Sequence, residues 1–133
     1  HDPIPAIREA LQHSIHLRGQ ADVPIGVAVS GGLDSSIVAG TLQALGHEQL
    51  PAFTATFPGF QFDESAYAAM MVEHIQGAWH TVTPTATDFW QDLQDLVYTQ
   101  ESPIQSASTY AQYRLMQLIQ ESGVKVLLDG NLR

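Results

Sequence analysis

The sequence predicts an α/β fold in which a parallel β-sheet lies between two layers of helices. Two observations support this prediction. Short apolar runs alternate along the chain with longer segments of helical periodicity, an order typical of strands joined by helical crossovers. The runs are also apolar throughout, as expected of strands that are covered on both faces. A chain of 133 residues can bury an ordinary hydrophobic core, and we expect residues 1–133 to form one domain.

The first half of the chain contains two predicted helices and two predicted strands. Near the N-terminus, apolar residues at helical spacing predict an amphipathic helix that packs one stripe on the sheet: Ile4, Ile7, Leu11 and Ile15. The apolar run 25–29 predicts a short buried strand, and residues 35–45 predict a helix that ends near Gly46. Residues 52–57 predict the second strand, which Pro58 and Gly59 interrupt.

The second half repeats this alternation. Asp63 is expected to cap a helix that Gly77 ends and whose members share one face: Tyr67, Met70, Met71, His74 and Ile75. A strand over 79–82 precedes a helix from Thr87 or Asp88 with its own apolar stripe: Phe89, Trp90, Leu93, Leu96 and Val97. A helix over 108–121 then leads into a strand over 124–128. We interpret the aromatic residues Trp79, Phe89 and Trp90 as core, and Asp88, Asp92 and Asp95 as a solvated helix face.

The string SGGLDSS, residues 30–36, is the most informative motif in the chain. It follows a predicted buried strand and opens a predicted helix. Gly31 and Gly32 allow a tight turn and bring backbone N–H groups close to a ligand, where the positive end of the helix dipole favours an anion. The loop is neither a Walker A sequence nor a dinucleotide fingerprint. The alternative is a plain turn whose Ser and Asp only cap the helix, but the complete string favours a phosphate site.

A second loop is expected to share this site. Parallel α/β sheets bind ligands beyond the carboxyl ends of their strands, where the strand order reverses. The SGGLDSS loop follows the first predicted strand, and Asp129 and Gly130 follow the last one. If these two strands are neighbours, both loops line one crevice.

Composition narrows the possible partners. The 14 acidic and 5 basic residues give a formal net charge of −9, which argues against a nucleic-acid surface because a polyanion requires clustered Lys and Arg. An acidic chain that binds a nucleotide is expected to recruit Mg²⁺. No apolar run is long enough for a membrane span and no signal peptide is evident, so we expect a cytoplasmic protein. The absence of cysteine agrees with that compartment and excludes a cysteine-dependent glutaminase within this sequence.

Four motifs in the same order resemble one known family. The loop matches SGGxDS, which is typical of the pyrophosphate-loop ATP pyrophosphatases, and its flanks resemble the synthetase domain of glutamine-hydrolysing asparagine synthetases. The segment FDESAYA over 62–68, the Glu101-Ser-Pro103 stretch with its following helix, and VKVLLDG over 124–130 are similar to further motifs of that family. The resemblance implies a three-layer fold of the adenine nucleotide α hydrolase type.

The resemblance also implies an activity and a set of site residues. Enzymes of this family cleave ATP between the α and β phosphates and activate aspartate as an acyl-adenylate, which ammonia from a separate glutaminase domain converts to an amide. Val29 and Ala55 would frame the adenine, Asp34 would also ligate Mg²⁺, and Asp129 and Gly130 would touch the ribose and the α-phosphate. The implied pyrophosphate cradle consists of Ser30, Gly31, Gly32, Asp34, Ser35 and Ser36.

The sequence departs from the family at its end. After the glycine, the family continues with an acidic residue and a Gly/Ala-Asp-Glu motif, whereas this chain has Asn131-Leu132-Arg133. We therefore expect a partial domain that self-associates and does not turn over alone. Two alternatives to aspartate amidation stay open. One is a related enzyme that closes an amide ring, as in β-lactam synthetases or lasso-peptide cyclases, and the other is a non-catalytic ATP-binding remnant.

Overall fold

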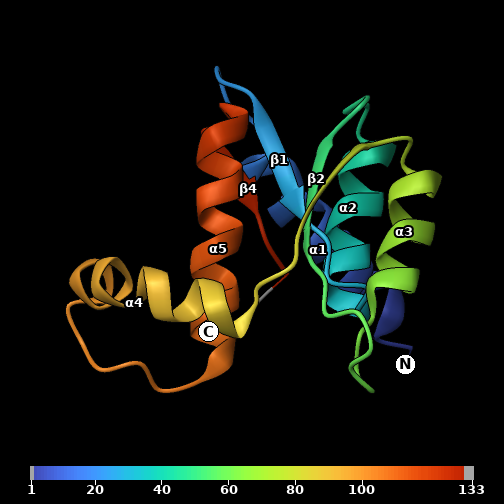
Figure 1. The fold of residues 1–133 in the computed structure, drawn as a ribbon. Coiled ribbons are helices and arrows are strands. Elements are labelled where there is room, and N and C mark those ends of the chain that lie inside the picture. Colours follow the sequence, from blue (N-terminus) through green and yellow to red (C-terminus); the bar gives the residue numbers. More distant parts are fainter. Residues whose placement is uncertain (1, 131–133) are drawn as a thin grey trace.

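The computed structural model describes residues 2–130, which form five helices and four strands (Figure 1). In chain order the elements are α1 (Ile4–Arg18), β1 (Ile25–Ala28), α2 (Leu33–Ala44), β2 (Pro51–Ala55), α3 (Ser65–His74), β3 (Ala78–Val82), α4 (Ala86–Gln100), α5 (Ala107–Ser122) and β4 (Val126–Leu128). The Asn131-Leu132-Arg133 departure from the family pattern lies outside the described residues. Within residues 2–130, no helix has the length and apolar character needed to cross a membrane.

The four strands form one parallel sheet in the order β3-β2-β1-β4. In the register, Val27 lies beside Ala52 on β2 and beside Leu128 on β4. From β1, the strands β2 and β3 follow on one side of the sheet, and β4 then pairs with the other side of β1. Strand order therefore reverses between β1 and β4, which is where folds of this kind bind ligands. The first and last strands are neighbours, which is the condition for their two loops to line one crevice.

Helices cover both faces of the sheet, as the sequence predicts. The α2 and α3 helices pack on one face and α5 packs across β2 and β3 on the other (Figure 1). The larger core cluster lies under α2 and α3 and includes Val27, Leu42 and Val72. A smaller cluster lies under α5 and is formed by Phe53, Ile119 and Val124. Burial of this apolar surface holds the strand ends, and the loops that follow them, in fixed positions.

Two predicted apolar faces are wrong in detail. In α1 only Ile15 is buried, and the helix lies against α2 instead of placing a full stripe on the sheet. In α3 the buried residues are Ala68 and Val72, while Tyr67 and Met70 are exposed. The predicted face is correct in part, because Ile75 is buried and Met71 packs against the core. The small Ala68 also faces inward, because this helix passes close to the loop that follows β1.

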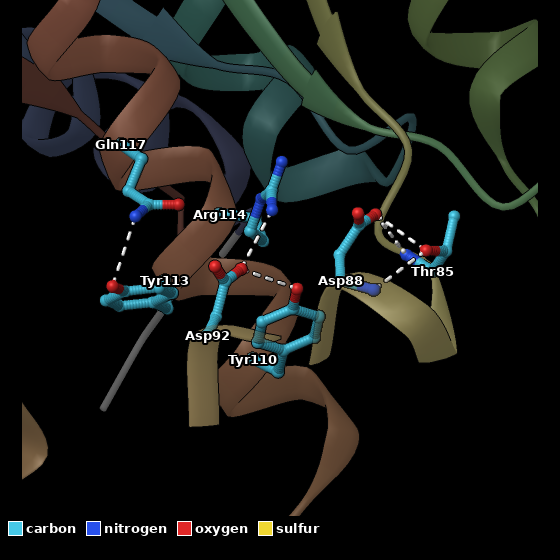
Figure 2. A network of polar contacts seen from close by, with 7 residues as sticks. All are labelled: Thr85, Asp88, Asp92, Tyr110, Tyr113, Arg114 and Gln117. Carbon is cyan, nitrogen blue, oxygen red and sulfur yellow. Dashed lines mark hydrogen bonds and ion pairs between the residues drawn. The ribbon is translucent and has the colours of Figure 1, made fainter. Parts of the chain in front are cut away.

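The α4 helix also differs from its prediction. Trp90 is 71 % exposed and is not a core residue, and only Leu96 is buried along the helix. Trp79 is likewise half-exposed at the edge strand β3. Thr85 and Asp88 form a reciprocal capping box that starts α4 (Figure 2). The helix ends at Glu101, which adopts a left-handed conformation with φ 51°.

A polar cluster joins α4 to α5 and corrects the interpretation of Asp92 as a solvated residue. The Asp92 carboxylate accepts one hydrogen bond from the Tyr110 hydroxyl and one from the Arg114 guanidinium, each at 2.8 Å (Figure 2). The Arg114 hydrogen bond holds the pKa of Asp92 below its usual range. Burial, together with hydrogen bonding to Asp92, raises the pKa of Tyr110 to about 12. Periodicity places Asp92 on the polar side of α4 but cannot reveal that this side faces α5.

Candidate functional site

The SGGLDSS loop lies between the end of β1 and the start of α2. Val29 continues the line of β1 and donates its N–H to the carbonyl oxygen of Phe53 at 2.9 Å. The chain then turns at Gly31, which has a φ of +94°, and Gly32 is the N-cap residue of α2. The first N–H groups of α2 have no partners within the helix, so they and the helix dipole give this point its affinity for anions.

The two glycines of the loop have different reasons to be glycine. A Cβ atom at Gly31 would stand 2.5 Å from the carbonyl oxygen of Glu64, and its positive φ is unfavourable for other residues. Gly32 has an ordinary φ of −75°, and a Cβ there would meet nothing closer than the Ser30 hydroxyl at 3.4 Å. The tight turn therefore depends on Gly31. At Gly32 the space is open, which leaves room for a ligand.

The serine hydroxyls of the loop hold its shape. The Ser35 hydroxyl accepts from the N–H of Ser30 at 3.2 Å and donates to the carbonyl of Gly32 at 3.1 Å. The Ser36 hydroxyl donates to the same carbonyl at 2.8 Å. The N–H of Gly32 donates to the Ser30 hydroxyl at 3.3 Å. This set of bonds fixes the loop before a ligand arrives, so little ordering remains to be done on binding.

The loop after β4 packs directly against the start of α2. A Cβ atom at Gly130 would lie 2.7 Å from the backbone carbon of Asp34 and 2.7 Å from the backbone nitrogen of Ser35. Only a glycine permits this approach. The two loops expected to share a crevice are therefore in contact, and the prediction that depended on neighbouring strands is confirmed.

A cavity of about 510 Å³ opens at this point of the sheet. Gly31 and Ser36 do not line it, because Gly31 packs under α3 and Ser36 turns back toward the carbonyl of Gly32. The remaining predicted site residues all line it: Val29, Ser30, Gly32, Asp34, Ser35, Ala55, Asp129 and Gly130. Val29 and Ala55 reach the same cavity because β1 and β2 are paired in parallel and their carboxyl ends lie at one edge of the sheet.

The sequence did not identify the wall that α5 contributes to this cavity. Five of its residues face the cavity: Ser108, Ala111, Gln112, Leu115 and Met116. Their spacing of three and four residues marks one side of a helix, and this pattern could have shown that they face the same way. A neighbouring cavity of about 440 Å³ between α5 and the end of α4 shares Gln112 and Met116 with the first.

Carboxylates dominate the charge of the cavity. Asp34, Asp63, Glu64 and Asp129 line it, and none of its described lining residues is Lys or Arg.

The Ser65 hydroxyl donates to Asp63 at 2.8 Å and lowers the pKa of that carboxyl. Asp63 also accepts from the backbone N–H groups of Phe57 and Ser65. It therefore precedes α3, whose N-cap residue is Glu64, one position later than predicted.

This donor set suits Mg²⁺ when a phosphate is also present. Mg²⁺ prefers oxygen ligands and is usually held by one or two carboxylates together with water and substrate phosphates. Among residues 2–130 no three His, Asp or Glu side chains converge on one point. A cation here would therefore take one or two carboxylates from the protein, and Asp34 at the first turn of α2 is placed beside the anion-binding loop.

A parallel α/β sheet with a glycine turn and a helix start at its switch point is typical of α/β domains that bind phosphate groups. Two solved structures share this fold with a TM-score of 0.57 and 13 % identity. One is an NH3-dependent NAD synthetase from Campylobacter jejuni, and the match covers 92 % of this chain and 54 % of the synthetase. The other is an NMN synthetase from Francisella tularensis, and the match covers 90 % of this chain and 52 % of that synthetase. Residues 6–132 match the asparagine synthase family, and the chain belongs to that family.

Known relatives carry two kinds of name. Asparagine synthetase B of Escherichia coli is 27 % identical over 93 % of this chain, and the asparagine synthetase of Sandersonia aurantiaca is 32 % identical over 97 %. The amidase chry2 of Gibberella zeae is 28 % identical over 93 %. These matches cover 25 %, 26 % and 21 % of the three relatives, so the chain spans about a quarter of their length.

Proposed function

We propose that this chain is the ATP-binding part of an amide-forming synthetase that activates aspartate as an acyl-adenylate. The observation that carries the proposal is the meeting of Gly31, the start of α2 and Gly130 beside one cavity of about 510 Å³. The first N–H groups of α2 lack partners within the helix there, and family membership supports ATP as their ligand.

Each part of the cavity has a role in this proposal. The β and γ phosphates lie on the loop from Ser30 to Ser36, and the adenine lies between Val29 and Ala55. Asp129 and Gly130 face the ribose and the α-phosphate. Mg²⁺ bound through Asp34 would neutralise part of the phosphate charge. Because the described lining residues include four carboxylates and no basic side chain, ATP binding should depend on a divalent cation.

The reaction proceeds in two displacements. A carboxylate oxygen of the substrate attacks the α-phosphorus, the bond from that phosphorus to the bridging oxygen of the β-phosphate breaks, and pyrophosphate leaves. Ammonia then attacks the acyl carbon, loses a proton, and displaces AMP as the amide forms. The fixed N–H groups of the loop stabilise charge that develops on the leaving pyrophosphate, and preorganised donors of this kind are effective in catalysis.

The test is exchange of labelled pyrophosphate into ATP. We would assay the full-length natural protein with Mg²⁺ and with or without aspartate. Exchange that requires aspartate and is lost in Asp34→Ala supports the proposal. Binding of Mg-ATP without exchange for any carboxylic acid would favour a non-catalytic nucleotide-binding module instead.

A related amide-forming enzyme with a different acid is the second candidate. The neighbouring cavity of about 440 Å³ is lined by uncharged polar side chains such as Gln105, Thr109 and Gln112. None of its described lining residues is a cation that could pair with the second carboxylate of aspartate. An amidase is also among the relatives. Exchange supported by other carboxylic acids but not by aspartate would favour this candidate.

A further inference from the structure

We propose that Thr54 is a positioning residue that sets the direction in which the phosphate loop leaves β1, and that Trp79 locks Thr54 in place. The inference rests on the proposed function, because it concerns the same loop. Thr54 lies on β2 and is 1 % exposed. Its hydroxyl donates to the carbonyl oxygen of Val29 at 2.7 Å, which makes it a buried contact with the last peptide group before the loop.

The peptide groups around Val29 are held on both sides by β2. The Val29 N–H donates to the Phe53 carbonyl at 2.9 Å, and the Val29 carbonyl accepts from Thr54. The plane of the peptide bond between Val29 and Ser30 depends on the direction of that carbonyl, because the peptide bond is planar. A rotation of this plane would swing Ser30, Gly31 and Gly32 away from the start of α2. The loop geometry thus depends on a side chain outside the loop.

Trp79 completes the arrangement from the edge strand β3. Its indole N–H donates to the Thr54 hydroxyl at 2.9 Å, and β3 lies next to β2 in the sheet. Because the hydroxyl accepts from Trp79, its own proton is free to point at Val29. The hydrogen bond to Thr54 requires the indole N–H of the half-exposed Trp79, a role that the interpretation of Trp79 as a core residue did not include.

Thr54 acts on the ligand only through Val29. Its neighbours Phe53 and Ala55 line the cavity, whereas Thr54 does not, because side chains alternate between the two faces of a strand. A substitution at Thr54 therefore changes no direct contact with a nucleotide. Loss of phosphate affinity in such a variant would have to pass through the loop.

The experiment compares phosphate and adenosine binding in Thr54→Val, which keeps the shape of the side chain and removes the hydroxyl. Isothermal titration calorimetry with Mg-pyrophosphate and with adenosine separates the loop from the adenine site. We expect a loss of about tenfold in Mg-pyrophosphate affinity, of the order found when a buried acceptor loses its donor. Adenosine affinity should fall clearly less than Mg-pyrophosphate affinity, because the Val29 N–H stays bonded to Phe53, and Thr54→Ser should restore Mg-pyrophosphate binding.

Thr56→Val is the matched control. Thr56 lies two residues after Thr54, directly beyond the end of β2. Its hydroxyl pairs with that of Thr83 at 2.7 Å instead of contacting Val29. It should leave both affinities unchanged. Trp79→Phe, which alters a half-exposed side chain, should weaken Mg-pyrophosphate binding about threefold. If Thr54→Val does not fold, the decision rests on Trp79→Phe and Thr54→Ser.

The outcomes separate this inference from the proposed function. If the wild-type protein binds neither Mg-ATP nor Mg-pyrophosphate, the proposed function is wrong and this inference fails with it. If the wild-type protein binds both, and Thr54→Val and Trp79→Phe bind Mg-pyrophosphate as tightly as it does, only the inference is wrong. An equal loss of adenosine and pyrophosphate affinity in Thr54→Val would also overturn it, because it would indicate general damage to the sheet.

Discussion

Alanine substitution of the two loop glycines should separate a backbone requirement from a ligand requirement. In Gly31→Ala, the φ of +94° costs about 1 to 3 kcal/mol for a residue with a Cβ. The new Cβ would also stand 2.5 Å from the Glu64 carbonyl oxygen and force the start of α3 to shift. Overpacking of this kind costs about 1 to 3 kcal/mol more. We expect the free energy of unfolding to fall by about 2 to 6 kcal/mol in total.

Gly32→Ala is the matched variant one residue later. Its φ of −75° suits alanine, and the nearest atom to the new Cβ is a serine hydroxyl at 3.4 Å. The free energy of unfolding should therefore stay within about 1 kcal/mol of wild type. The methyl group would instead occupy the open side of the loop, so Mg-ATP affinity should fall although stability does not.

Urea denaturation followed by circular dichroism measures the stability of both variants, and calorimetry measures Mg-ATP affinity. A loss of less than about 2 kcal/mol in Gly31→Ala would contradict this prediction, since strain and overpacking together should exceed that value. The prediction is also refuted if the two variants lose equal stability. Normal Mg-ATP binding by Gly32→Ala would show that the phosphates do not pass over this residue.

Three further predictions concern the metal, the contact between α4 and α5, and the sheet edge. Asp34→Ala should weaken Mg-ATP binding far more than binding of Mg²⁺-free AMP, and calorimetry showing equal losses would remove Asp34 from the metal role. The lowered pKa of Asp92 means that its contact with Arg114 is fully present above the pKa of the unfolded chain, near 4. The stability that this contact provides should be lost as the pH falls through the pKa of Asp92 in the folded protein, which is lower still. The free energy of unfolding should therefore fall less steeply at acid pH in Asp92→Asn than in the wild-type protein, and Asp95→Asn should not have this effect. Self-association is expected because β4 lies at the sheet edge beside an apolar groove of about 640 Å³, and Val126→Lys should reduce the sedimentation coefficient of the chain if this edge is responsible.

The sequence by itself determined the class of fold and the place of the site. Apolar runs and helical periodicity depend on neighbours close along the chain, so the order of strands and helices could be predicted with small errors at their ends. The SGGLDSS string also carries its own geometry, because a glycine with positive φ followed by a helix start needs no distant partner. The sequence did not predict the strand order, and the pairing of β1 with β4, which brings the two loops together, is seen only in the structure.

Only the tertiary structure decided which faces meet. Tyr67, Met70 and Trp90 are apolar enough for a core but are exposed, because burial depends on which element passes nearby. Asp92 lies on a polar helix face and still forms an ion pair with Arg114, 22 residues later, because α5 returns to that face. The α5 wall of the cavity and the contact of Thr54 with Val29, 25 residues away, have the same cause. Periodicity shows that a face exists, but only the three-dimensional path of the chain determines what that face touches.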